Sequence, residues 1–238
     1  MANDRPLLAV LIDADNTSPK HAHAIFEEIA TLGEASVRRC YGDFSSVQMS
    51  GWNRVQAEHG LVPLHSPANT VGKNSSDISL VIDAMDLLHT GRFSGFVLVS
   101  SDSDFTRLAS RIREQGLDVY GIGQQKTPDA FRKACKRFIF LENLGSQPES
   151  KGTERTPARP DAPPLTQARD LILRAMDGIE QDDEWFPLGA LGNFIAAANP
   201  DFDTRTYGKK KLSDLVADLK IFDTRRGPNN QLLVRRID

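Results

Sequence analysis

Two acidic clusters come immediately after hydrophobic segments at two distant places in the chain. The first, Asp13–Asn16, follows the apolar run Leu7–Ile12, and the second, Ser101–Asp104, follows Phe96–Ser100. Carboxylates that converge on one place repel one another unless a cation binds between them. The simplest chemistry for such clusters is to hold a divalent metal ion, so the sequence describes a candidate metal-dependent enzyme.

A parallel sheet would bring these clusters together. Strand and helix patterns alternate up to about Leu144, which is typical of a doubly wound α/β sandwich. With a strand order of 3-2-1-4-5, the first and fourth strands would lie side by side, and both clusters would emerge at the switch point where such sheets bind ligands. The expected strands are Leu7–Ile12, Ala35–Tyr41, Leu61–Leu64, Phe96–Ser101, Leu117–Ile122 and Phe138–Leu141. The expected helices are Pro19–Leu32, Val47–His59, Asp77–His89, Phe105–Gln115 and Asp129–Lys136.

A third acidic residue, Asp77, stands at the start of a predicted helix. Alone it would be interpreted as an N-cap or first-turn residue, but with the two clusters it completes a set of carboxylates suited to Mg²⁺ or Mn²⁺. Lys73, in the loop just before it, is equally consistent with a substrate-phosphate contact and with a plain surface loop. Asp83 either supports the site or makes an ordinary buried hydrogen bond, and Asp15 and Asn16 hold either the metal or the loop.

The composition indicates an ordinary globular protein. The 238 residues are 39% hydrophobic and 26% charged, with a formal net charge of −3, so the overall charge gives no sign of nucleic acid. No apolar run approaches the roughly 20 residues that cross a bilayer, and the start of the sequence lacks the basic and apolar segments of a secretory signal. Cys40 and Cys135 have no metal-ligand spacing and are interpreted as reduced core thiols. We therefore expect a cytoplasmic protein without a membrane partner.

The last part of the chain is organised differently. Residues 146–164 contain repeated prolines and almost no apolar side chains, which predicts a flexible linker. Beyond it, helical patterns over 166–217 precede two strand-like runs, Phe222–Thr224 and Leu232–Val234, on either side of a Gly-Pro-Asn-Asn turn. Helices followed by a hairpin predict a winged-helix domain. Basic residues outnumber acidic ones over 205–238, which fits a phosphate-contacting face and a solvated surface equally well.

The same carboxylates allow a second interpretation. Asp13–Thr17 fits D-x-D-x-T, the opening motif of the haloacid-dehalogenase-like phosphatases, in which the first Asp is a nucleophile and the second an acid/base. The rest of the chain fits that family poorly, because Ser18 and Pro19 start a helix at once and leave no room for its flap hairpin. Lys73 is a weak candidate for the charged partner that the family requires.

Three motifs, taken in order, resemble the NYN branch of the PIN-like ribonucleases, the LabA-like proteins, from Leu7 to about Leu144. The motifs are Leu11–Asn16, Gly72–Met85 and Leu98–Phe105. The resemblance implies a PIN-like α/β/α sandwich whose acidic residues bind Mg²⁺ or Mn²⁺. The implied metal-binding and catalytic set is Asp13, Asp77, Asp102 and Asp104. The resemblance makes Asn16 a substrate-binding or loop-orienting residue, and Lys73 and Ser101 are the other substrate-binding residues expected beside it.

The region after the linker, about Leu165 to Ile237, resembles the OST-HTH or LOTUS domain, a winged-helix module. The matching segments are Trp185–Gly189, Tyr207–Leu215, Phe222 and Leu232–Val234. Such modules are associated with RNA binding, and some contact protein partners. The basic residues placed to approach an RNA backbone are Arg205, Lys209, Lys210 and Lys211.

Together these features predict a metal-dependent endoribonuclease whose RNA substrate is expected to be single-stranded. The expected domains are a nuclease domain over 1–145, a flexible linker over 146–164 and a winged-helix RNA-binding domain over 165–238. A catalytically inactive RNA-binding adaptor is the main alternative. A protein partner for the C-terminal domain and a homo-oligomer both stay open.

Overall fold

The computed structural model describes residues 5–45, 49–65, 75–145, 163–181 and 183–237. The chain divides into two compact units, Met1–Ser146 and Gln147–Asp238, each with its own hydrophobic core. Lys73 and nearly all of the predicted linker lie outside the described residues.

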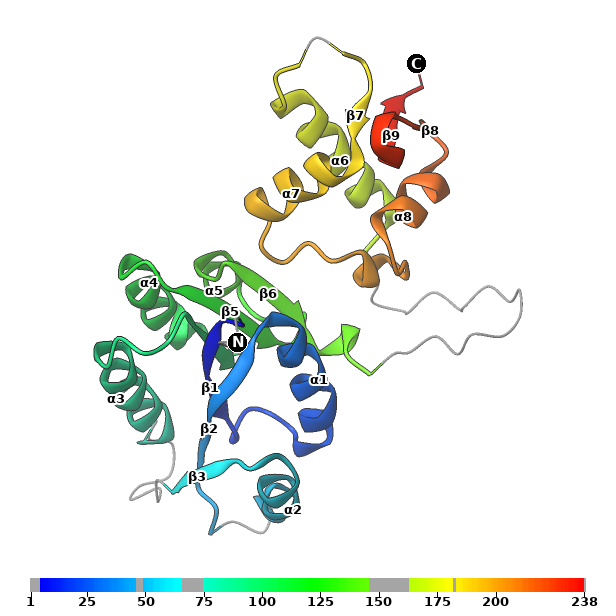
Figure 1. Ribbon diagram of the computed structural model, residues 1–238. Helices are drawn as coiled ribbons and strands as arrows, with labels where there is room; N and C mark the ends of the chain where they lie inside the picture. The colour runs from blue at the N-terminus through cyan, green and yellow to red at the C-terminus, as the bar shows by residue number, and fades with distance from the viewer. Residues whose placement is uncertain (1–4, 46–48, 66–74, 146–162, 182, 238) are drawn as a thin grey trace. The chain divides into compact units, whose positions relative to one another are not determined.

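The first unit is built on a sheet of six parallel strands in the order β3-β2-β1-β4-β5-β6 (Figure 1). The central strand β1 is hydrogen-bonded to β2 on one side and to β4 on the other, as the sequence predicted. The carboxyl ends of β1 and β4 therefore lie next to each other at one edge of the sheet. The strands are β1 Leu7–Asp13, β2 Glu34–Gly42, β3 Val62–His65, β4 Gly95–Val99, β5 Asp118–Gly123 and β6 Arg137–Phe140.

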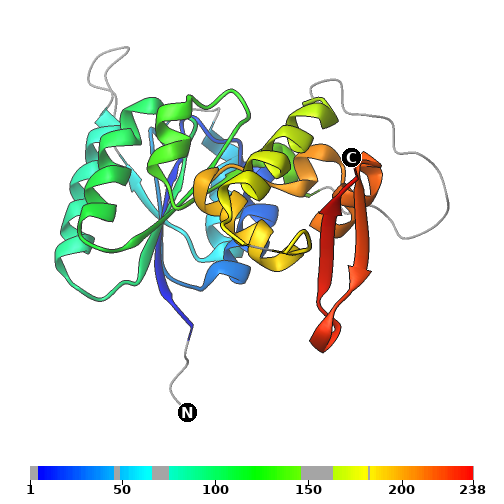
Figure 2. The same cartoon turned by 90° about the horizontal axis from the view of Figure 1, so that it is seen from above.

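Helices cover both faces of this sheet, and for that reason the central strands are continuous apolar runs, with every residue of β4 buried. Side chains of α1 and α2 pack on one face, and those of α3, α4 and α5 pack on the other, where the green helices of Figure 2 lie together. The α-helices are α1 Ala22–Leu32, α2 Ser50–His59, α3 Ser75–His89, α4 Thr106–Glu114 and α5 Asp129–Ala134. Short 3₁₀ helices are η1 Pro19–His21, η3 Ser103–Phe105 and η4 Leu141–Asn143.

The structure places the start of one helix and the end of one strand differently from the prediction. The helix expected over Pro19–Leu32 begins with the separate 3₁₀ turn η1. The strand expected over Phe96–Ser101 ends at Val99, although the Ser100 N–H still donates to the Ile122 carbonyl at 3.0 Å, and the Ser100 hydroxyl donates to Asp13. That difference matters for the site described below.

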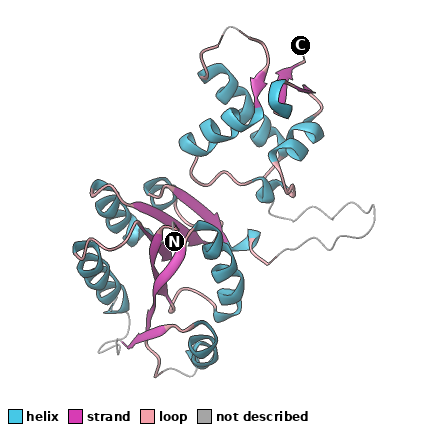
Figure 3. Cartoon of the chain, viewed as in Figure 1, coloured by secondary structure: helices cyan, strands magenta, loops and turns pink. Residues whose placement is uncertain are grey.

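The second unit is helical with a small antiparallel sheet in the order β7-β9-β8, and Figure 3 shows its short magenta strands among cyan helices. Strands β8 and β9 form the predicted hairpin, and the helices precede them, which is the winged-helix arrangement. The two-residue strand β7 was not predicted, because so short a segment has no recognisable alternation. The elements are α6 Leu165–Gly178, β7 Phe186–Pro187, α7 Leu188–Ala198, η5 Thr204–Tyr207, α8 Leu212–Leu219, β8 Phe222–Arg226, η6 Pro228–Asn230 and β9 Leu232–Arg236.

Candidate metal centre and RNA-binding residues

Asp13, the last residue of β1, is 1% exposed and its carboxylate is held by three hydrogen bonds. The backbone N–H of Asn16 donates to Oδ1 at 3.2 Å, and the Asn16 amide donates to Oδ2 at 2.9 Å. The Ser100 hydroxyl donates to the same Oδ2 at 2.7 Å. Burial raises the pKa of Asp13, the hydrogen bonds from Ser100 and Asn16 act in the opposite direction, and the charge of Asp15 raises it further.

Ser100 links the two acidic clusters. Its Oγ donates to Asp13 and accepts from the backbone N–H of Asp102 at 3.1 Å. Asp102 in turn is the N-cap of η3, where its Oδ1 accepts from the N–H of Asp104 at 2.9 Å. Sequence reasoning missed this serine because it was taken as the continuation of the strand, although a hydroxyl directly between a buried strand and an acidic cluster is a readable signal.

Asp77, in the first turn of α3, lies within the electrostatic field of both clusters. Burial raises its pKa, and the charges of Asp13, Asp102, Asp15 and Asp104 add to that effect, so that the pKa of Asp77 reaches about 6. Three chain segments that are far apart in sequence thus bring their carboxylates to one edge of the sheet.

These carboxylates influence one another electrostatically, but they do not surround one point as the ligands of a metal ion would. Among the residues that the structure describes, no group of three or more His, Cys, Asp or Glu side chains could hold a metal ion as placed. The donor chemistry nevertheless suits a hard divalent cation, because every contributing side chain is a carboxylate. Burial is the main cause of the raised pKa of Asp77, and the neighbouring carboxylate charges, which a divalent ion would offset, add to it.

Comparison with known families gives the identity of both units. The model of the NYN domain family matches residues 7–142, more than half of the chain. The chain belongs to the NYN domain family. The model of the OST-HTH/LOTUS domain matches residues 163–234, so that an NYN domain is followed by an OST-HTH domain. NYN domains are PIN-like nucleases and OST-HTH domains bind RNA, which makes this chain an RNA-related nuclease or RNA-binding protein.

Two similar chains among the solved structures have no assigned activity. A protein of unknown function from Vibrio parahaemolyticus is 18% identical, with a TM-score of 0.49, over 59% of this chain and 95% of its own. An uncharacterized protein from Nitrosomonas europaea is 35% identical, with a TM-score of 0.27, over 39% of this chain and 86% of its own. No curated protein matches the chain.

Two further polar residues of the NYN domain join the loops around the centre. Asp15 Oδ1 accepts from the backbone N–H of Asp43, which connects the loop after β1 to the loop after β2. Ser101 Oγ accepts from the backbone N–H of Gln124 at 2.9 Å, which connects the loops after β4 and β5. Both side chains therefore have structural partners, and a substrate contact of Ser101 stays a prediction.

Asp83 anchors α3 to the sheet. Its two carboxylate oxygens accept from the guanidinium of Arg39 and from the hydroxyl of Tyr41, both on β2. Burial and the adjacent Asp83 charge raise the pKa of Tyr41, so the phenol stays protonated and acts as a donor. The sequence left open whether Asp83 supports the site or makes an ordinary hydrogen bond, and its contacts fix the position of the helix that carries Asp77.

The four basic residues singled out in the OST-HTH domain are not equivalent. The Arg205 guanidinium donates to both oxygens of Asp203, at 3.1 and 2.9 Å from Nε and 2.6 Å from Nη2. Lys209 Nζ lies 3.0 Å from a carboxylate oxygen of Asp218. Lys210 and Lys211 are exposed, and neither forms an ion pair with any described residue.

Across the described parts of the chain, no helix has the length and apolar character needed to cross a membrane.

Proposed function

We propose that the protein is a metal-dependent endoribonuclease whose NYN domain hydrolyses RNA phosphodiesters at the carboxylate edge of its sheet. The observation that carries this proposal is the position of Asp77 in the joint field of both acidic clusters. Such concentrated negative charge is costly in a protein without a cation, and it is common at sites of phosphoryl chemistry. The residues that would hold Mg²⁺ or Mn²⁺ are Asp13, Asp77, Asp102 and Asp104.

The protein's own residues have distinct parts in this mechanism. A bound divalent ion would lower the pKa of a water molecule and stabilise the leaving oxygen. Ser100 and Asn16 hold the Asp13 carboxylate in one orientation before any ligand arrives. The Asp13 side chain is buried, which keeps competing water away from that carboxylate. In-line attack of water on phosphorus that breaks the P–O3′ bond would leave a 5′-phosphate on one fragment and a 3′-hydroxyl on the other.

The structure favours this activity over a phosphatase of the haloacid-dehalogenase type. Helix η1 begins at Pro19, directly after the Asp13–Thr17 motif, and α1 continues to Leu32. No flap hairpin fits between the motif and these helices. The OST-HTH domain also favours a polymeric RNA substrate, because hydrolysis of a small phosphomonoester does not require an RNA-binding domain.

A cleavage assay tests the proposal. The full chain is incubated with a 5′-labelled single-stranded RNA and Mn²⁺, beside Asp13→Asn, Asp102→Asn and Asp86→Asn. The Asp86→Asn variant is the matched control, because this carboxylate is exposed on α3 and is not among the charges that raise the pKa of Asp77. We expect Asp13→Asn and Asp102→Asn to lose at least about 10²-fold in rate, with Asp86→Asn close to wild type. Equal rates in all four proteins would refute the assignment.

An inactive RNA-binding adaptor is the second candidate, and one observation favours it. The carboxylates, as the described residues place them, do not form a closed group of ligands. This candidate predicts RNA binding by the full chain with no cleavage above that of Asp13→Asn in Mg²⁺ or Mn²⁺.

A further inference from the structure

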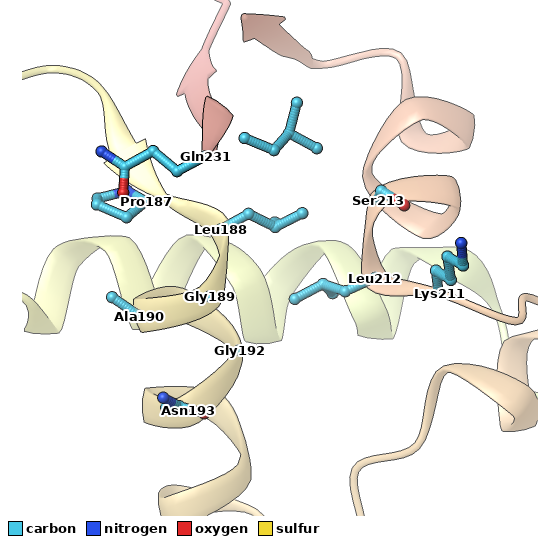
Figure 4. A pocket seen from close by; sticks show the side chains of 11 residues that line it. Pro187, Leu188, Gly189, Ala190, Gly192, Asn193, Lys211, Leu212, Ser213 and Gln231 are labelled. Carbon is cyan, nitrogen blue, oxygen red and sulfur yellow. The ribbon is translucent and has the colours of Figure 1, made fainter. Parts of the chain in front are cut away.

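The OST-HTH domain contains an open groove of about 760 Å³ that the sequence analysis did not anticipate (Figure 4). It lies where three elements begin: α7, α8 and β9. Its lining residues are Pro187, Leu188, Gly189, Ala190, Gly192, Asn193, Lys211, Leu212, Ser213, Gln231 and Leu232.

The lining of the groove combines apolar surface with hydrogen-bonding groups. Leu188 from α7 and Leu212 from α8 extend into the space from opposite sides, as Figure 4 shows. The amides of Asn193 and Gln231 and the hydroxyl of Ser213 also belong to the lining. A flat ring with polar edges, such as a nucleobase, matches this combination, because apolar side chains pack on its faces while amides pair with its edge.

The electrostatics of the groove favour an anion. Helices α7 and α8 both start at it, and neither has a side-chain hydrogen bond at its N-cap, which is Pro187 in one and Lys211 in the other. Uncapped first-turn N–H groups and the helix dipole attract phosphate. Lys211 adds a full positive charge that has no ion-pair partner in the described part of the chain. Asp214, the acidic residue in the first turn of α8, is exposed and does not line the groove.

We propose that this groove binds one unpaired nucleotide of an RNA strand, with the base packed on the apolar wall to which Leu188 and Leu212 contribute and a phosphate at Lys211 and the start of α8. The inference rests on the proposed function in taking RNA as the ligand, and it deepens that function by assigning the recognition site. The proposal gives Lys211 a larger part in RNA binding than Lys210, since Lys211 lines the groove and Lys210 does not. Charge complementarity favours RNA over an apolar peptide as the occupant.

Gly189 offers a direct way to block the groove. A Cβ placed on this residue meets no atom within 4 Å, so a side chain there enters open space at the groove wall. Gly189→Trp therefore adds a large side chain at the groove wall without a clash in the core. Gly189→Ala is the matched control, because it makes the same glycine replacement and adds only a methyl group. A second matched pair is Lys211→Gln and Lys210→Gln, which remove one unpaired charge inside and outside the groove.

The experiment measures binding by the full chain of a short, fluorescein-labelled, single-stranded RNA by anisotropy in EDTA, where metal-dependent cleavage is suppressed. We expect Gly189→Trp to weaken binding about tenfold or more, with Gly189→Ala within about twofold of wild type. Lys211→Gln should weaken binding by roughly threefold to tenfold and reduce the slope of log Kd against log salt by about 0.7, the value for one contact to a single-stranded phosphate. Lys210→Gln should change both quantities less.

Circular dichroism and thermal melting of each variant establish that the OST-HTH domain is folded. Wild-type affinity in folded Gly189→Trp would overturn the proposal, and so would equal effects of Lys210→Gln and Lys211→Gln, since diffuse charge would then explain binding. A wild-type chain that does not bind RNA in EDTA also overturns it. The nuclease assignment is judged separately, by the loss of Mn²⁺-dependent cleavage in Asp13→Asn.

Discussion

At the scale of single residues, the centre depends on how each carboxylate is held. Asp13 has hydrogen-bond donors on both oxygens and is buried, whereas Asp15 and Asp104 are exposed. The sequence predicted which carboxylates gather at this edge, because their spacing after apolar strands is a strong signal. Ser100 was not predicted as the bridge, since it was taken as part of the apolar strand before the second cluster.

Removing the Ser100 hydroxyl should impair the centre without unfolding the domain. Ser100→Ala takes away a donor to Asp13 Oδ2 and the acceptor for the Asp102 N–H. We expect cleavage to fall about tenfold and the Mn²⁺ concentration for half-maximal activity to rise, because Asp13 loses a hydrogen bond that favours its charged form. Titrating Mn²⁺ in the cleavage assay measures both. Ser110→Ala, whose hydroxyl donates only within α4, is the control expected to match wild type.

The stability of the metal-free domain should depend on the proton at Asp77. Burial and the nearby carboxylates raise the pKa of Asp77 from 3.8 to about 6. Since the folded-state pKa lies above the unfolded one, the protonated side chain contributes stability that is present below about pH 4 and lost as the pH rises through about 6. Asp77→Asn cannot lose a proton, so its advantage over wild type should grow between about pH 5 and pH 7, to roughly 1–3 kcal/mol.

Thermal melting of wild type and Asp77→Asn in EDTA at several pH values tests this. The difference in Tm should widen by several degrees as the pH rises. A difference that stays constant across the series would show that Asp77 does not titrate in this range. The same proton competes with a cation, so Mn²⁺ should raise the Tm of wild type more at about pH 7 than at about pH 5.

At the scale of elements, the placement of α3 determines where Asp77 stands. This helix is fixed to β2 through Asp83, which accepts from Arg39 and Tyr41. Its opposite face exposes Ile78 and Ile82, so hydrophobic pattern alone does not define the contact. Helical periodicity in the sequence predicted the element and its length well. The polar anchor was left open because a carboxylate in mid-helix gives no hint of partners on a strand more than forty residues earlier.

Breaking this anchor should destabilise the NYN domain. Asp83→Ala leaves the Tyr41 hydroxyl without an acceptor and the Arg39 charge without its partner. We expect a loss of about 2–3 kcal/mol in the free energy of unfolding, measured by urea denaturation. Asp86→Ala on the exposed side of the same helix should change it by less than about 0.5 kcal/mol. Similar losses in both variants would mean that the network is not a structural anchor.

At the scale of the whole molecule, two units with separate cores are joined in one chain. Alternating strand and helix patterns predicted the doubly wound parallel sheet of the first unit, because parallel strands buried on both faces are long apolar runs, and the order supposed for the first five strands agrees with the structure. The winged-helix character of the second unit was readable from its helices and hairpin. Its groove could not be predicted from the sequence, because the starts of α7, α8 and β9 come together only in the folded domain.

Removing the OST-HTH domain should raise the KM for RNA and leave kcat nearly unchanged. A chain that ends at Gly145 keeps every described strand and helix of the NYN domain. We expect its kcat for RNA cleavage to stay within about threefold of the full chain while its KM rises about tenfold or more, because the tethered RNA-binding site no longer raises the local RNA concentration. Steady-state kinetics on a labelled RNA measure both constants. An unchanged KM would show that the OST-HTH domain does not help to capture the substrate.

The place of β1 in the middle of the sheet has a consequence for the newly synthesised protein. Asp13 is made early, but the hydroxyl that holds it belongs to Ser100, 87 residues later in the chain, and β4 must dock beside β1 before the two meet. A nascent chain on the ribosome therefore carries the first carboxylates without a finished centre. The order of strands therefore means that Asp13 and Ser100 can meet only after β4 has been synthesised and has docked beside β1.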